Sequence, residues 1–265
     1  MQLKIKQTLL IMSHFINEIL SKTIGFKLTR AKIRRVDKTK DFPIYVEFIG
    51  IPAVGKSTLY QNVFKEVKRK WRDIHEFQRI FTEHTDGTTI DSLSYYELLS
   101  ESKMQSVVSR DFSGLDQMKL VKYFHSVLVA DSLIYLFNKD YNVMSEEGLI
   151  HNFGESLFAL SKSNEEDFKS LMKHRAVVYC HASAEIVAKR ILERKEKTGK
   201  LLPQHKLDSL DDLVKLQQKS LEQKHLTVDF LHNYAIPVLS IDTSKPMIEN
   251  INQVKQFLNE LTQRK

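Results

Sequence analysis

Cysteine, tryptophan, proline and glycine are all scarce in this chain. Its 265 residues include one cysteine, one tryptophan, five prolines and eight glycines. The single Cys180 excludes an intramolecular disulfide and fits a reducing compartment such as the cytoplasm. Internal repeats and low-complexity tracts are also absent, which excludes repeat architectures. The shortage of glycine makes any glycine motif informative.

A long hydrophobic run is missing as well. Residues 9–20 are mostly apolar, but His14, Asn17 and Glu18 interrupt them. They fall short of the roughly 20 apolar residues that span a bilayer, and no small-residue cleavage pattern follows. We interpret residues 1–40 as an amphipathic helix with a basic connector that packs on its own domain. Weak peripheral membrane contact through residues 1–38 is the alternative, and liposome flotation with and without that segment distinguishes the two.

The charge is unbalanced toward lysine and arginine. The net charge is +7, and basic residues cluster at 27–40 and 189–206, which suits an anionic partner. Basic motifs interleaved with aromatic residues, typical of nucleic-acid modules, are absent, which argues against nucleic acid as the partner. With 42% apolar residues, the chain can form the core of one α/β domain with insertions. The oligomeric state cannot be read from the sequence.

Against this background one stretch matches a phosphate-binding loop, G-x-x-x-x-G-K-[ST], at every defined position. In a chain so poor in glycine the pattern arises by accident in only about a few per thousand sequences. The apolar run 44–49 before it predicts a buried parallel strand, and residues 57–69 after it predict an amphipathic helix. The loop consists of Gly50, Ile51, Pro52, Ala53, Val54, Gly55, Lys56 and Ser57.

Strand, loop and helix together explain how this motif binds a nucleoside triphosphate. Glycines let the backbone approach the phosphates, and the N–H groups at the helix start point at the anion. Lys56 is expected to reach the β- and γ-phosphates, and the Ser57 hydroxyl to ligate Mg²⁺. Thr58 is expected to help hold the α-phosphate end.

A second constellation follows a short extended run at 141–144. After Ser145 come Glu146 and Glu147, where a parallel strand of a phosphate-loop enzyme faces the phosphates. We assign Glu146 to the metal and Glu147 to proton abstraction, with the roles open to exchange. The competing interpretation is that both glutamates simply favour the positive end of a helix at 147–161.

Paired arginines follow a further strand at 176–180. Ser183 is a plausible helix cap, and Arg190 and Arg194 lie four residues apart on one face of the helix that follows it. They could neutralise a migrating phosphoryl group, and the basic segment 190–206 has the composition of a lid. An ordinary solvated helix face is the competing interpretation.

The remaining segments complete an α/β pattern. We predict a short strand at 77–81, helices at 92–109 and 116–137, and a late strand at 237–241 followed by a helix at 247–261. The buried face of the first helix is expected to carry Tyr95, Leu98, Leu99 and Met104. The loop after the late strand is expected near the base of a bound nucleotide. Its candidate contacts are Thr243, Ser244 and Lys245.

From residue 42 to 262 this order of parts resembles the P-loop nucleoside and nucleotide kinases of the adenylate and thymidylate kinase type. The resemblance rests on the phosphate loop, on VVYCHASAEIVAKRILERK and on PVLSIDTSKP. It implies a three-layer αβα domain at 41–265 with a mostly parallel five-stranded sheet, ATP and Mg²⁺, and a small-molecule phosphoryl acceptor. The helical region 91–137 with Arg110 would then meet the acceptor, and Asp111 is an alternative base to Glu147.

One departure and two other classes stay open. Thymidylate kinases place Asp-Arg where this chain has Glu146-Glu147, so a thymidylate acceptor is doubtful. The acidic pair also resembles the strand end of ATP-hydrolysing motors, which keeps an ATPase or nucleotide-dependent switch acting on a protein partner as the alternative. Segments 111–114 and 138–141 imitate GTPase motifs, but Tyr141 stands where the guanine-reading aspartate is needed.

Overall fold

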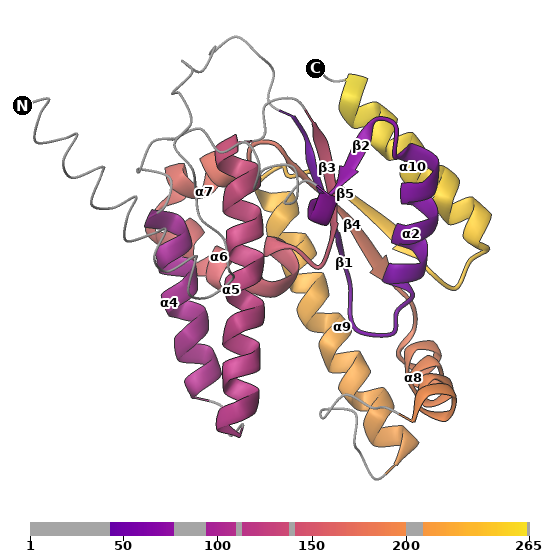
Figure 1. Ribbon diagram of the computed structural model, residues 1–265. Helices are drawn as coiled ribbons and strands as arrows, with labels where there is room; N and C mark the ends of the chain where they lie inside the picture. The colour runs from indigo at the N-terminus through magenta and orange to yellow at the C-terminus, as the bar shows by residue number, and fades with distance from the viewer. Residues whose placement is uncertain (1–42, 77–93, 110–112, 138–140, 200–208, 264–265) are drawn as a thin grey trace, which may run out of the picture.

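The core of the molecule is one parallel β-sheet with helices on both faces (Figure 1). The computed structural model describes residues 43–76, 94–109, 113–137, 141–199 and 209–263. Within them the strand order is β2-β3-β1-β4-β5, and all neighbours are parallel. The strands are β1 (Tyr45–Ile49), β2 (Trp71–Asp73), β3 (Asn142–Glu146), β4 (Arg175–His181) and β5 (Val238–Asp242).

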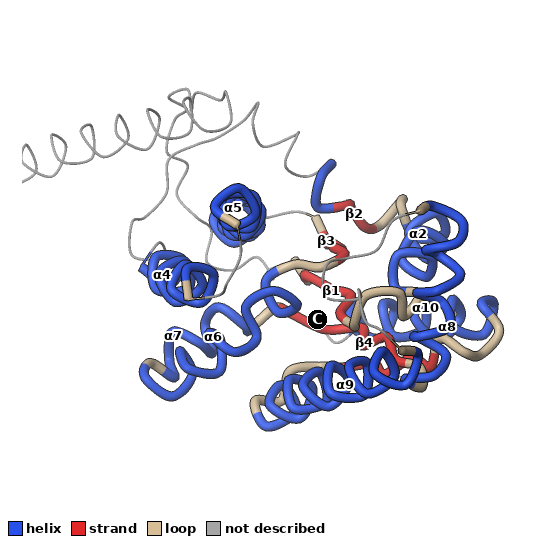
Figure 2. The backbone as a smooth tube through the Cα atoms, turned by 90° about the horizontal axis from the view of Figure 1, so that it is seen from below, coloured by secondary structure: helices blue, strands red, loops and turns tan. Residues whose placement is uncertain are grey.

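Helices form the two outer layers (Figures 1 and 2). On one face lie α2 (Lys56–Val67) and α10 (Met247–Gln263), which pack on each other. On the other lie α6 (Leu149–Ser163), α7 (Glu165–Met172) and α9 (Leu210–Asn233), with the hairpin of α4 (Ser94–Val108) and α5 (Gly114–Phe137) against α6. The remaining helix, α8 (Ala184–Thr198), packs against α9.

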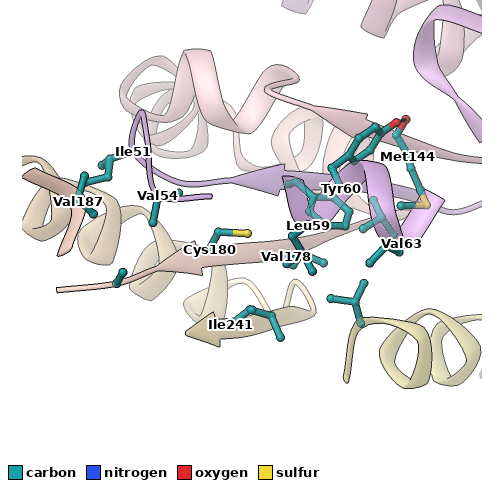
Figure 3. Packing of buried hydrophobic residues seen from close by; sticks show 14 of the residues in the cluster. Ile51, Val54, Leu59, Tyr60, Val63, Met144, Val178, Cys180, Val187 and Ile241 are labelled. Atoms are coloured by element: carbon teal, nitrogen blue, oxygen red, sulfur yellow. Dashed lines mark hydrogen bonds between the residues drawn. The ribbon is translucent and has the colours of Figure 1, made fainter. Parts of the chain in front are cut away.

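The pleat of β1 divides its side chains between two cores. Val46 and Phe48 join the cluster under α2 and α10, whereas Ile49 joins the cluster under α6, α7 and α9. Figure 3 shows the first cluster, in which Leu59 and Val63 of α2 approach the strands. Removing this apolar surface from water stabilises the sandwich by about 25 cal/mol per Å². The sequence expectation of a three-layer α/β domain with a five-stranded parallel sheet is confirmed.

Several boundaries differ from the expectation. The predicted strand at 77–81 lies outside the described residues, and the sheet takes its second strand from Trp71–Asp73. Helices α7 and α9 were not predicted. On α4, Leu98 and Met104 are exposed, so the predicted buried face is wrong for both, and Tyr96 and Leu99 fill the core. No helix among the described residues has the length and apolar character needed to cross a membrane.

A buried ion pair joins the helical hairpin to the sheet. Arg175, the first residue of β4, donates Nη1 and Nη2 to the carboxylate of Asp131 in α5 at 2.8 and 2.5 Å. Its Nε donates to Leu171 O at 2.9 Å, and the Tyr96 hydroxyl of α4 donates to Asp131 at 2.8 Å. With every charge satisfied, the pair fixes where α4 and α5 meet the sheet.

Breaking this pair should be costly. We expect Arg175→Met to lower the free energy of unfolding by about 3–5 kcal/mol, because it leaves the Asp131 carboxylate buried without its partner. Urea denaturation followed by circular dichroism measures the loss. The double variant with Asp131→Leu should recover part of it, and a loss below about 1 kcal/mol in the single variant would contradict the structure.

Candidate active site

The phosphate-binding loop leaves the carboxyl end of the central strand and enters α2. Because β1 lies between β3 and β4, this point is a switch in strand order, where α/β sheets bind ligands. A Cβ on Gly50 would lie 2.5 Å from the carbonyl oxygen of Cys180, so only glycine fits there. Ala53 and Gly55 have φ values of 65° and 102°, which turn the backbone tightly. Among the described residues no side chain caps α2, so its N–H groups stay available to an anion.

The ammonium group of Lys56 is buried between two carboxylates. Its Nζ lies 2.6 Å from Glu147 Oε1 and 3.2 Å from Glu146 Oε1, and its side chain is only 4% exposed. The Ser57 hydroxyl donates to the same oxygen of Glu146. A strand, a loop and a lysine in this arrangement decide the fold type. The chain has a P-loop NTPase fold.

The position of Glu147 depends on an unusual backbone. Its φ is 61°, in the left-handed region that few residues other than glycine adopt. Its N–H donates to Phe48 O at 3.3 Å, and the amide of Asn152 donates to its carbonyl oxygen at 2.7 Å. The two glutamates therefore precede α6, which begins at Leu149, and do not form its first turn.

Two further side chains face Glu147. The Tyr123 hydroxyl donates to Glu147 Oε2 at 3.4 Å, and burial beside this carboxylate raises the pKa of Tyr123 to about 12, so the hydroxyl stays protonated. The Nε2 of His151 lies 3.9 Å from Glu147 Oε1. Burial, together with nearby ammonium groups, holds the pKa of His151 well below its ordinary value, so the imidazole is neutral at pH 7.

The oxygen donors at this point suit Mg²⁺. The Ser57 hydroxyl and the Glu146 carboxylate lie within hydrogen-bond reach of each other, at the end of the P-loop. Magnesium prefers such hard oxygen ligands, keeps several waters and takes its other ligands from the phosphates. Ser57 and Glu146 would hold the ion, and this assignment from the sequence stays a prediction.

Arg190 lies behind the P-loop. It donates from Nη1 to Val54 O at 2.6 Å and from Nη2 to Thr243 O at 2.9 Å. The Thr243 hydroxyl donates to Val54 O as well, so the loop after β5 is attached directly to the P-loop. This places Thr243 beside the P-loop and gives Arg190 a contact with the loop backbone. Its expected contact with the migrating phosphoryl group stays a prediction.

The other candidate residues in the described part of α2, α8 and the loop after β5 are exposed. Arg194 is exposed one turn beyond Arg190. Its guanidinium group is therefore not placed with that of Arg190 against Val54 O and Thr243 O. Ser244 donates both its N–H and its hydroxyl to Asp242 Oδ1, which closes the turn after β5, and Lys245 is exposed. Thr58 is exposed on the first turn of α2.

Three expectations from the sequence fall partly or wholly on undescribed segments. Arg110 and Asp111 lie outside the described residues. Of the predicted lid at 190–206, residues 190–198 form the end of α8, which stops at Gly199 with a φ of 65°, and residues 200–206 are not described. The lid and the roles of Arg110 and Asp111 therefore stay predictions.

A cavity of about 410 Å³ adjoins Glu146 and contains an acid that the sequence did not reveal. Asp73 ends β2, accepts the hydroxyl hydrogen of Tyr60 and accepts the N–H of His75 at 2.8 Å. Tyr60 also donates to Met144 O at 3.1 Å, so β2, β3 and α2 meet here. The lining residues are Tyr60, Gln61, Phe64, Lys65, Asp73, Ile74, His75 and Glu146.

Comparison with known proteins adds similarity of fold alone. No family model and no curated protein sequence matches the chain. Among solved structures it is similar to a gluconokinase from Sinorhizobium meliloti 1021, with 13% identity, a TM-score of 0.41 and coverage of 85% of this chain and 97% of that one. A shikimate kinase from Bacteroides thetaiotaomicron shows 12% identity, a TM-score of 0.42 and coverage of 82% and 98%.

The contacts of Arg190 predict how the two arginines differ. Arg190→Ala removes charged hydrogen bonds to Val54 O and Thr243 O, each worth about 1.5–3 kcal/mol, and loosens the P-loop. We expect it to weaken binding of a fluorescent ATP analogue at least about tenfold, or about 1.4 kcal/mol. Arg194→Ala should change binding less than about twofold. Equal effects of the two variants on binding would contradict the interpretation that the hydrogen bonds of Arg190 stabilise the P-loop.

Proposed function

We propose that this protein is an ATP- and Mg²⁺-dependent kinase that transfers the γ-phosphoryl group to a small-molecule acceptor. One observation supports this most strongly. The P-loop Lys56 is buried against the carboxylates of Glu146 and Glu147, beside a cavity that adds the carboxylate of Asp73. A phosphate site next to several acids suits both metal binding and proton abstraction.

The site already contains a buried cation and two carboxylates, the charged groups that phosphoryl transfer requires. When ATP enters, Lys56 exchanges the carboxylate of Glu147 for phosphate oxygens and neutralises the β- and γ-phosphates. Glu147 is then released from its ion pair. Bound Mg²⁺ would shield the phosphate charge while held by Ser57 and Glu146.

Transfer also needs a base for the acceptor hydroxyl. As its oxygen bonds to the γ-phosphorus, the bond to the bridging oxygen breaks, ADP leaves and the hydroxyl proton passes to a carboxylate. Glu147 is the first candidate, with Tyr123 and the neutral His151 orienting it. Asp73 is a second candidate, because it lines the cavity where an acceptor of about 410 Å³ or less would fit. Asp111 stays a third.

The acceptor could be a nucleoside or a sugar, which supplies a hydroxyl, or a nucleotide, which supplies a hydroxyl or a phosphate oxygen. Hydrolysis of ATP is the alternative reaction, because the same carboxylate could activate water. In that case the protein would be an ATPase or a nucleotide-dependent switch with a protein partner.

One assay separates transfer from hydrolysis. The protein is incubated with γ-labelled ATP, Mg²⁺ and panels of nucleosides, nucleotides and sugars, and we expect label on one acceptor class. Lys56→Ala should lower transfer at least about a thousandfold without unfolding the protein, since it removes the main phosphate cation. Free phosphate at turnover rates without any acceptor would favour the ATPase. Full transfer activity in Lys56→Ala would contradict the site assignment.

Two matched variants then identify the base. Glu147→Gln and Asp73→Asn each keep the side-chain shape and remove the carboxylate. The base variant should lower kcat about a hundredfold or more with little change in the KM for ATP. The other variant should act mainly on the KM for the acceptor. Unchanged kcat in both variants would exclude both residues as the base.

A further inference from the structure

The central strand carries a buried glutamate that the proposed reaction has not used. Glu47 lies in the middle of β1 and is 1% exposed. Its neighbours Val46 and Phe48 fill the core under α2 and α10, so Glu47 projects to the opposite face, toward α6. A carboxylate in such a place destabilises the fold unless hydrogen bonds satisfy it.

The partners of Glu47 are the first N–H groups of α6. Its Oε2 accepts the N–H of Ile150 at 2.9 Å, and its Oε1 accepts that of His151 at 2.5 Å. Gly148, the residue before the helix, offers no side-chain cap. Glu47 therefore caps α6 from another strand, with its negative charge at the positive end of the helix.

The same turn carries the acids of the active site. Glu146 and Glu147 directly precede Gly148, and a Cβ on Gly148 would lie 2.9 Å from Glu47 Oε2. The turn is thus packed on the Glu47 carboxylate with no room for another atom. Any displacement of this carboxylate must move the turn that holds Glu147 against Lys56.

Charged groups on several elements surround Glu47. From α9, the half-buried Lys224 donates to His151 O at 2.9 Å, so opposite charges hold the two backbone groups of His151. The other facing groups are Tyr45 on the same strand, Ser145 on β3, Tyr123 on α5, the neutral His151, and the Arg175–Asp131 pair. Burial raises the pKa of Glu47 to about 7, although the two N–H groups and Arg175 act in the opposite direction and Asp131 adds to the rise.

We propose that Glu47 is a positioning residue, which fixes Glu146 and Glu147 relative to Lys56 through the first turn of α6. The inference rests on the proposed function for the roles of these two carboxylates. It adds a buried charge on the central strand to the machinery of transfer.

The charge state of Glu47 should make both kcat and stability depend on pH. Protonation removes the negative charge that holds the two N–H groups, so we expect kcat to fall as the pH drops through about 7. Stability should change in the other direction. A carboxyl group whose pKa is raised on folding contributes stability below its unfolded pKa, and this contribution is lost as the pH rises through about 7.

Glu47→Gln tests the inference, because it keeps the shape and removes the charge. We expect kcat to fall at least about tenfold, with the KM for ATP within about twofold. The acid limb of the wild-type pH profile near neutrality should disappear. Amide hydrogen exchange at residues 149–151 should become faster, since the cap of the first turn is weakened.

Two further variants distinguish a loss of positioning by Glu47 from a general loss of the fold. Phe168→Leu removes part of a fully buried side chain of α7 and should lower Tm without changing kcat or its pH dependence. Glu47→Asp keeps the charge on a shorter side chain, so it should lower kcat yet retain the acid limb. It replaces Glu47→Gln as the test if that variant does not fold.

Two results would overturn the inference. One is a Glu47→Gln variant with the wild-type kcat and pH profile. The other is a Phe168→Leu variant that has the same Tm as Glu47→Gln and loses as much kcat. If the wild type neither transfers the γ-phosphoryl group nor hydrolyses ATP, the proposed function fails by itself. The role of Glu47 is then decided by amide hydrogen exchange at residues 149–151, and unchanged exchange rates in Glu47→Gln would reject it.

Discussion

The charge on Lys56 is the constraint that organises this molecule. A lysine side chain only 4% exposed needs compensating negative charge, because transfer of its ammonium group from water is strongly unfavourable. Two glutamates supply it in the free protein, and the phosphates of a nucleotide would supply it in the bound form. The parallel register that sets Phe48 of β1 beside Glu146 of β3 brings lysine and acid together. The site is thus built by sheet geometry, with the loop providing the cation.

Polar contacts inside the fold place the neighbouring elements around that charge. The buried Asp131–Arg175 pair fixes α5 to β4, and two turns earlier the same helix presents Tyr123 to Glu147. Arg190 and Thr243 attach the end of the P-loop to α8 and to the loop after β5. The apolar clusters hold the layers together, whereas these hydrogen bonds determine where the reactive side chains lie.

The sequence revealed the parts whose chemistry fixes both residue type and spacing. A loop that wraps phosphate needs glycines and a lysine at set intervals, so Gly50, Gly55 and Lys56 could be predicted with their surrounding strand and helix. The strand-end position of Glu146 followed from the same topology. Segments without such a constraint were harder. Strand β2 is three residues long, which is too short for a periodic pattern, and Asp73 was missed with it. In α9 the buried Gln217 and the half-buried Lys224 interrupt the apolar stripe that identifies a helix. The buried role of Glu47 depends on N–H groups about 100 residues away, so a charge inside an apolar run gave no sign of it.

Isothermal titration calorimetry of the purified protein with ATP tests the nucleotide site most directly. We expect one binding site per chain in the presence of Mg²⁺ and a clear loss of affinity when the ion is chelated, since Ser57 and Glu146 would then lose the ion that joins them to the phosphates. No binding heat with ATP or GTP over a range of temperatures, with the protein folded throughout, would contradict the site at its foundation.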